Sequence, residues 1–185
     1  GAPFLAVVWF GSPHGPHRAS EKFRKMYADL DKKKQHFYGE MTGMDYAFGK
    51  LRGEIDRLGI RKNTILWYCR DNGGLDRKTT GGRGKKGQVY EGGLRVPGIL
   101  EWPAAIPAHR ATDVPCVTSD IYPTLLAIVG VAVENQPPLD GISLVPLIKN
   151  RMNSRPKPIG FWDYPIRGIR TPSSTFMKQV LDAQN

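Results

Sequence analysis

An acidic side chain and an amide side chain directly follow an apolar segment near the middle of the chain. Residues 64–69 (TILWYC) are largely apolar, and Arg70 is followed by Asp71 and Asn72. In α/β proteins, ligands bind where buried strands emerge at their carboxyl ends. Hard divalent cations take several oxygen ligands of this kind. Asp71 and Asn72 are therefore candidate ligands for part of a metal site.

The same residues also match a plain turn, because Asn72-Gly73 is a common hairpin signal. The preceding run does not alternate between apolar and polar residues, however, and no second strand follows immediately. A metal site remains the more informative hypothesis, and its other ligands must come from elsewhere.

A glycine-spaced basic loop follows about a dozen residues later. It runs from Gly81 to Gly87 and carries Arg83, Lys85 and Lys86. Residues 82–87 match the dinucleotide pattern GxGxxG, but they do not connect a strand to a helix as that site requires. The phosphate-loop pattern fails too, since Gly87 stands where Ser or Thr should follow the lysine. A cationic loop near two oxygen ligands suits a tetrahedral oxyanion.

His14 lies in a proline- and glycine-rich segment, residues 12–17 (SPHGPH), after the apolar run of residues 4–10 (FLAVVWF). It is either a loop residue or a functional group at a strand end. The remaining histidines have weaker cases, and their spacings match no zinc pattern.

Composition restricts the class of protein. The 185 residues are 40% hydrophobic and carry a net charge of +10, which indicates a globular chain with an anionic partner. The aromatic residues fall in apolar runs rather than between the cations, which argues against nucleic acid. No apolar run reaches about 18 residues, so we expect no membrane span. The two cysteines are expected to pack as small hydrophobes.

The elements that would position these residues alternate between strand and helix. We expect strands over 4–10, 64–69, 96–102 and 159–162. A helical stripe of apolar residues runs from Phe37 to Leu58 and ends at Gly59. This order predicts an α/β fold with a mainly parallel sheet flanked by helices.

Other segments have simpler interpretations. Residues 18–35 are a solvated helical face or a connection. Asp120 is expected to cap a helix that reaches Ile128 and is closed by Gly130. Ser143 is expected to cap a short helix to Lys149. Residues 154–156 belong to a polar linker. We expect one domain over 1–165, with 166–185 as a tail or the start of a further element.

The ordered set of motifs resembles the type I sulfatase family of the alkaline phosphatase-like superfamily. The matching motifs, in chain order, are Ser12-Pro13-His14-Gly15-Pro16, Met44-Asp45, Phe48-Gly49, Asp71-Asn72-Gly73-Gly74, Lys86, Glu91-Gly92-Gly93, Arg95-Val96-Pro97, Trp102-Pro103, 119–126 (SDIYPTLL) and 140–144 (DGISL). The resemblance covers roughly residues 3–163, and implies an incomplete alkaline phosphatase-like catalytic domain.

The resemblance implies a role for each candidate residue. Asp71 and Asn72 would be two ligands of an active-site calcium ion, and Asp71 would additionally take a proton from the nucleophile. Lys86 would contact the sulfate and the leaving oxygen. His14 would bind the ester oxygen or help to protonate the leaving group. The substrate would be a sulfated small molecule or a sulfated glycan, and the family is typically periplasmic or secreted.

Three features depart from the family pattern. The family's formylglycine nucleophile, made within Cys/Ser-x-Pro-x-Arg, has no counterpart here, and neither do its paired acidic metal ligands. We expect those segments to precede Gly1, and the 185 residues alone to be inactive. Arg70 also replaces a small residue, although strand alternation would direct it away from Asp71. The alternatives are a phosphodiesterase or phosphonate hydrolase of the same superfamily, or a non-catalytic remnant that binds anionic glycans.

Overall fold

The computed structural model describes residues 2–75, 82–163 and 177–181. Its contacts divide the chain into two compact units, residues 1–61 and 62–185, and each is described by itself. The predicted division at residue 165 falls within residues 164–176, which lie outside the described residues, and it stays a prediction.

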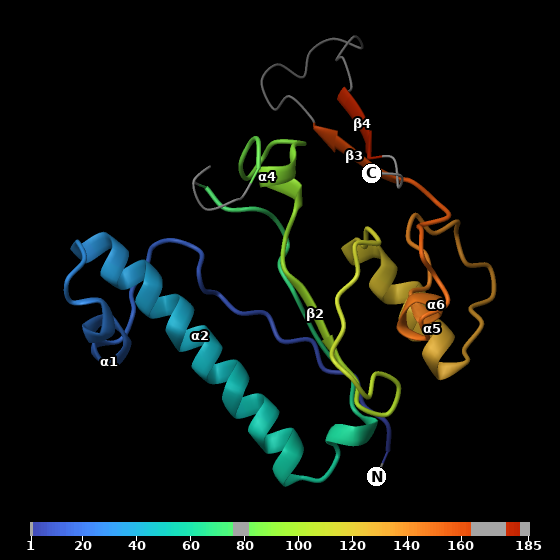
Figure 1. Cartoon of the computed structure of the whole chain (residues 1–185), viewed down its shortest axis with the longest axis horizontal. Helices are drawn as coiled ribbons and strands as arrows, with labels where there is room; N and C mark the ends of the chain where they lie inside the picture. The colour runs from blue at the N-terminus through green and yellow to red at the C-terminus, as the bar shows by residue number, and fades with distance from the viewer. Residues whose placement is uncertain (1, 76–81, 164–176, 182–185) are drawn as a thin grey trace. The chain divides into compact units, whose positions relative to one another are not determined.

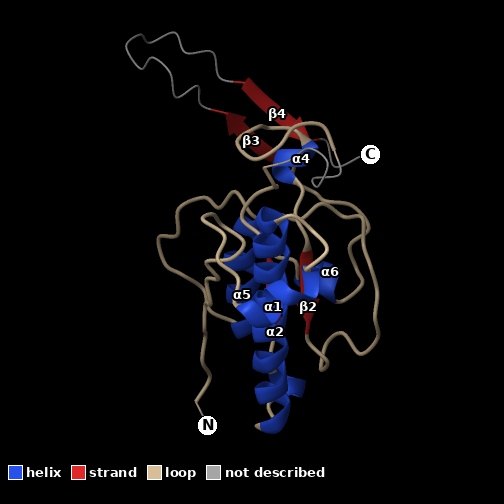
Figure 2. Ribbon diagram, turned by 90° about the vertical axis from the view of Figure 1, so that its left-hand side faces the viewer, coloured by secondary structure: helices blue, strands red, loops and turns tan. Residues whose placement is uncertain are grey.

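The long helix α2 (Lys32–Arg57) dominates the first unit (Figure 2). It begins five residues before the predicted stripe, because the Asp31 side chain accepts a hydrogen bond from the Lys34 N–H at 3.0 Å and so caps the helix. It ends at Arg57, and Gly59 follows it as the predicted left-handed cap, with a positive φ of 68° that a glycine adopts without strain. The three lysines before the stripe therefore lie in the first helical turn.

The segment preceding α2 packs against it through short helices. These are α1 (Glu21–Arg24) and η1 (Lys25–Tyr27). The Glu40 carboxylate accepts from His17 Nδ1 at 2.9 Å and from the Arg18 N–H, which fastens the incoming chain to α2. Gly39 lets the chain approach, since a Cβ there would lie 2.7 Å from the Ala19 Cβ.

Residues 4–10 form no strand in the structure, so this prediction is wrong. The segment is extended and most of its apolar side chains are exposed, with Trp9 91% exposed. An apolar run becomes a strand only where another strand satisfies its backbone groups. The described residues place no such neighbour beside this run.

The described residues of the second unit form two antiparallel strand pairs. In the first, β1 (Leu66–Cys69) pairs with β2 (Gly98–Glu101), and Cys69 lies opposite Gly98. In the second, β3 (Ile159–Asp163) pairs with β4 (Met177–Leu181). Three predicted strands are thus confirmed with changed bounds. The prediction of mainly parallel pairing is not met in the described pairs, because the chain between β1 and β2 returns to the end that it left (Figure 1).

The remaining helices of the described residues are short. They are η2 (Arg61–Asn63), α4 (Glu91–Leu94), η3 (Thr118–Asp120), α5 (Ile121–Val129) and α6 (Val145–Ile148). Gly130, with φ of 70°, closes α5 as predicted. The Ser143 hydroxyl accepts from the Val145 N–H at 3.3 Å at the start of α6. No helix in the described part of the chain is long and apolar enough to cross a membrane.

Candidate active-site loops

The antiparallel pair β1–β2 brings the two candidate loops together. The chain leaves β1 at Cys69, passes through Asp71 and Asn72 and then through Lys86, and re-enters β2 at Gly98, opposite Cys69. One strand pair therefore anchors both ends of the segment 70–97. The predicted carboxylate and the predicted cation belong to a single closed loop system.

Hydrogen bonds between backbone groups join the two loops directly. The Gly73 N–H donates to the Gly93 carbonyl at 2.9 Å, and the Lys86 N–H donates to the Gly74 carbonyl at 2.8 Å. The turn after Asn72 thus contacts both the segment of Lys86 and helix α4. We call these two hydrogen bonds the loop clasp.

Glycine is required where the loop clasp forms. A Cβ on Gly73 would lie 2.0 Å from the Gly92 carbonyl oxygen, and one on Gly93 would lie 2.1 Å from the Gln88 carbonyl oxygen. No side chain fits at such distances. The motifs Asn72-Gly73-Gly74 and Glu91-Gly92-Gly93 are therefore two halves of one backbone contact.

Asp71 and Asn72 are available to a ligand. The Asp71 side chain is exposed and has no hydrogen-bond or ion-pair partner among the described residues. The Asn72 Nδ2 donates to the Gly73 carbonyl at 3.1 Å, so its Oδ1 stays free to accept. Arg70 is half-buried, unlike Asp71.

These two oxygen donors fit a hard cation such as calcium, which takes six to eight oxygen ligands. They form only part of such a site. No group of three or more His, Cys, Asp or Glu side chains that could hold a metal ion occurs within residues 2–75, 82–163 and 177–181. The donor set agrees with the calcium expectation in type and is incomplete in number.

Lys86 is partly exposed, and its neighbour Lys85 is exposed. Neither ammonium group has a carboxylate partner in the described ranges. In the loop clasp, the Lys86 N–H is hydrogen bonded to the carbonyl of Gly74, which lies two residues after Asn72. The arrangement can bind an anion on the cationic loop, beside oxygen donors for a metal.

His14 belongs to the first unit, whereas the other three candidates belong to the second. Its backbone N–H donates to the Gly11 carbonyl at 3.0 Å, which forms a turn. Its Nδ1 lies 2.8 Å from the Gly15 carbonyl oxygen and must carry the hydrogen, because a carbonyl only accepts. In the neutral ring, Nε2 therefore holds the free lone pair.

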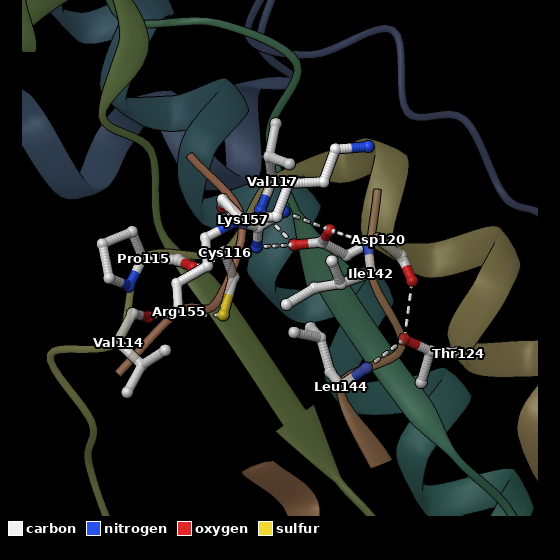
Figure 3. A network of polar contacts seen from close by, with 10 residues as sticks. All are labelled: Val114, Pro115, Cys116, Val117, Asp120, Thr124, Ile142, Leu144, Arg155 and Lys157. Carbon is white, nitrogen blue, oxygen red and sulfur yellow. Dashed lines mark hydrogen bonds and ion pairs between the residues drawn. The ribbon is translucent and has the colours of Figure 1, made fainter. Parts of the chain in front are cut away.

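The most buried polar cluster in the described chain lies elsewhere, around Asp120 and Arg155 (Figure 3). The side chains are 0% and 1% exposed. Arg155 Nη2 donates to Asp120 Oδ1 at 2.8 Å, and Nη1 donates to Oδ2 at 2.7 Å. Two backbone groups, the N–H of Ile142 and the N–H of Val117, donate to the same carboxylate at 2.8 and 2.9 Å.

This cluster corrects two predictions. The Asp120 side chain does not cap α5, and Arg155, expected in a polar linker, is buried. Sequence offered no signal for Arg155, since its partner lies 35 residues away. The four hydrogen bonds to the carboxylate leave it no capacity for a ligand, so we interpret the cluster as structural.

Comparison with known proteins shows the family. The model of the family described as "Sulfatase" matches residues 1–131. Arylsulfatase D of Homo sapiens is 35% identical over 161 residues, which are 80% of this chain and 26% of that protein. The ulvan-active sulfatase of Formosa agariphila is 29% identical over 204 aligned positions, covering 95% of this chain and 40% of that protein.

The solved structures agree in fold. The crystal structure of Ps i-CgsB in complex with k-i-k-neocarrahexaose superimposes with a TM-score of 0.75 at 30% identity, over 83% of this chain and 35% of that one. This match confirms the alkaline phosphatase-like α/β fold expected from the sequence. The chain spans about a quarter to two fifths of the length of these proteins. Family model, relatives and fold together show that this chain belongs to the sulfatase family.

Proposed function

We propose that this chain forms one wall of the active site of a sulfuric ester hydrolase. In this proposal Asp71 and Asn72 hold calcium, Lys86 contacts the sulfate and the leaving oxygen, and His14 assists at the ester oxygen. Family membership supports the reaction class. The loop clasp, which fixes the Lys86 backbone beside the turn after Asn72, is the observation that supports the site.

Hydrolysis of a sulfate ester transfers the sulfuryl group away from an alkoxide or phenoxide, so negative charge grows on the leaving oxygen. Fixed cations stabilise such charge best where they are already in place. Lys86 supplies an ammonium group on a loop whose backbone is held by two hydrogen bonds. His14 supplies a ring nitrogen, Nε2, that can carry a proton to the leaving oxygen when the ring is charged.

Asp71 and Asn72 Oδ1 would hold the calcium ion together with ligands from other residues. When bound, the ion supplies positive charge that neutralises the sulfate oxygens. Arg70 is half-buried, whereas the Asp71 carboxylate is exposed. In this proposal, the residues of this chain orient the ester and stabilise the negative charge that develops on it. They include no Cys/Ser-x-Pro-x-Arg nucleophile segment.

The substrate we propose is a sulfated glycan or a sulfated small molecule. One relative is an ulvan-active sulfatase, and one structural neighbour was solved with a neocarrahexaose, a hexasaccharide. The net charge of +10 is consistent with a polyanionic partner.

The test uses the complete coding sequence that contains these residues, expressed as one protein. We expect Lys86→Ala to lower kcat/KM for a sulfate ester by about a hundredfold to a thousandfold, as loss of a transition-state cation contact does. Lys85→Ala, which removes the adjacent exposed cation, should change it less than about threefold, in line with a screened surface charge. Asp71→Ala should abolish the response of activity to calcium.

Three results would overturn the proposal. Equal losses in the two lysine variants would show that only net charge matters. Hydrolysis of phosphate diesters or phosphonates but not of sulfate esters would favour the related hydrolase. Heparin binding that is unaffected by calcium removal and by Asp71→Ala, without any turnover, would favour a glycan-binding protein.

Residues 1–185 alone are expected to hydrolyse no sulfate ester. They carry two oxygen donors for the metal and no nucleophile segment. Turnover by the purified 185-residue chain that disappears in its Lys86→Ala variant would contradict this expectation.

A further inference from the structure

The loop that carries Lys86 is closed at its base by a contact between Arg83 and Tyr90. The Arg83 Cζ lies 4.0 Å from the centre of the Tyr90 ring, and Arg83 Nη2 donates to the Tyr90 hydroxyl oxygen at 3.2 Å. Stacking on a ring combined with a hydrogen bond restrains a guanidinium group in a way that a lysine ammonium does not. We call this pair the loop brace.

Backbone hydrogen bonds to the carbonyls of Arg83 and Tyr90 reinforce the loop brace. The Arg83 carbonyl accepts from the Gly92 N–H at 2.8 Å, and the Tyr90 carbonyl accepts from the Gly93 N–H at 2.7 Å. Gly93 in turn accepts from Gly73 in the loop clasp. The loop brace and the loop clasp are therefore connected through two adjacent glycines of helix α4.

The glycine at position 84 leaves room for Tyr90 to pack against the loop. A Cβ on Gly84 would lie 2.9 Å from the Tyr90 Cβ, and Gly84 has a φ of 86°. Gly87 has a φ of 82°, which again favours glycine. Lys86 sits between these two glycines, so its position depends on the closure at Arg83 and Tyr90.

We infer that Arg83 is a positioning residue for Lys86, acting through its contact with Tyr90 rather than through its charge. This inference rests on the proposed function only for its effect on catalysis; the restraint on the loop stands on the contacts alone. Removing the brace takes away one restraint on residues 83–90, and the Lys86 ammonium then samples a wider volume.

Lys85 is the matched control for charge. It lies in the same loop, is exposed, and takes no part in the brace through its side chain. Lys85→Ala and Arg83→Ala remove one positive charge each, but only the second removes the stacked guanidinium. Arg83→Lys keeps the charge and loses the planar group.

The first experiment needs no activity. Amide hydrogen exchange is followed in the 185-residue chain at Lys86 and Gly92, whose N–H groups are hydrogen bonded, with the amides of β1 and β2 as internal reference. Arg83→Ala, Arg83→Lys and Tyr90→Leu should each speed exchange at both positions by tenfold or more, on the basis that each lost restraint shifts a local opening equilibrium. Lys85→Ala should leave it unchanged, and Tyr90→Phe should have an intermediate effect.

The second experiment uses the complete protein and a sulfate ester. Arg83→Ala and Arg83→Lys should both lower kcat roughly tenfold to a hundredfold, as a small misplacement of a catalytic group does, with a smaller change in KM. The melting temperature should stay that of the wild type.

The outcomes separate the two claims. Wild-type protein that hydrolyses no sulfate ester would sink the proposed function, while the exchange data would still decide on the brace. Unchanged exchange at Lys86 in Arg83→Ala, or full rescue of exchange and kcat by Arg83→Lys, would overturn the brace.

Discussion

At the scale of single residues, Asp120 and Arg155 form a buried ion pair whose side chains are 0% and 1% exposed. Both carboxylate oxygens are satisfied, and the Arg155 guanidinium also donates to the Lys157 carbonyl at 2.7 Å. A buried charge whose partner is removed is costly because it cannot be resolvated. The pair therefore stabilises the structure because both charged groups are hydrogen bonded, and not only because they attract each other.

We predict that Arg155→Leu lowers the free energy of unfolding by about 3–5 kcal/mol, because it leaves the Asp120 carboxylate buried and unpaired. Arg151→Leu is the control, since Arg151 is exposed a few residues earlier, and it should change stability by less than about 0.5 kcal/mol. Urea denaturation of both variants measures the difference. Equal effects would show that the pair contributes nothing beyond an ordinary surface arginine.

The same carboxylate predicts a dependence of stability on pH. Burial alone would raise the pKa of Asp120, but the hydrogen bonds from Arg155, Ile142 and Val117 outweigh burial and lower it. A lowered folded pKa means that the stabilisation is complete above the unfolded value of about 3.9 and is lost as the pH falls through the folded pKa.

Between neutral pH and about pH 3, the free energy of unfolding of the wild type should therefore fall more steeply than that of Asp120→Asn. The comparison of variants matters because Glu40 also has a lowered pKa, where burial opposes the shift and hydrogen bonds from Arg18 and His17 produce it. Parallel pH profiles would contradict the assignment to Asp120.

At the scale of elements, the glycines of α2 divide into two kinds. Gly39 meets the Ala19 Cβ and the Arg24 backbone, and Gly43 meets the Phe23 ring, whereas a Cβ on Gly49 would meet nothing within 4 Å. The first kind lets neighbouring segments pack against the helix. The second kind only weakens the helix, because glycine loses more backbone entropy than alanine on folding.

We predict opposite effects of one substitution at two positions. Gly49→Ala should raise the free energy of unfolding by about 0.5–1 kcal/mol. Gly39→Ala should lower it by about 1–3 kcal/mol, since the added methyl group displaces the segment around Ala19. Thermal unfolding of the two variants decides, and a stabilised Gly39→Ala would show that the contact with Ala19 is easily relieved.

Elements with a local signal were predictable from sequence, and elements that depend on distant partners were not. The apolar stripe and Gly59 located α2, and residues 64–69 and 159–162 located two strands. The run 4–10 had an equally strong local signal, yet the described residues provide no paired strand for it. Strand pairing is a property of two segments, and one segment cannot specify it.

The candidate site shows the same limit. Asp71 and Asn72 were predicted as ligands from their type and position, and Lys86 was predicted from the family resemblance; these roles stay predictions, while the loop clasp joins the backbones of the two segments. The contact between Arg83 and Tyr90 was missed because it depends on the path of the loop. Arg155 was missed because its partner Asp120 lies far along the sequence.

At the scale of the whole molecule, the chain combines a strong positive charge with exposed apolar residues. The net charge is +10. Within residues 4–9, the apolar side chains that are most exposed, between 56% and 91%, are those of Phe4, Leu5, Val7, Val8 and Trp9. An apolar patch of this kind drives association or dye binding when nothing covers it. Charge repulsion opposes the association and is screened by salt.

We predict that the 185-residue protein self-associates increasingly as the ionic strength rises. A double substitution, Val7→Lys with Trp9→Lys, should reduce both the association and the binding of a hydrophobic dye. Sedimentation velocity at low and high salt measures the first effect, and dye fluorescence measures the second. A wild-type chain that stays monomeric at all salt concentrations and binds no dye would contradict the prediction.

The network around Asp120 has a further consequence for how the chain tolerates being cut. It joins residues 117–124 on one side to residues 142–144 and 155 on the other, while the intervening residues 131–135 are exposed. A protease nick within 131–135 should therefore leave two pieces that co-elute on size exclusion and separate only in denaturant or in the Arg155→Leu variant. New chain termini within residues 131–135 should be tolerated for the same reason. The buried ion pair would hold the two sides together in place of the peptide chain.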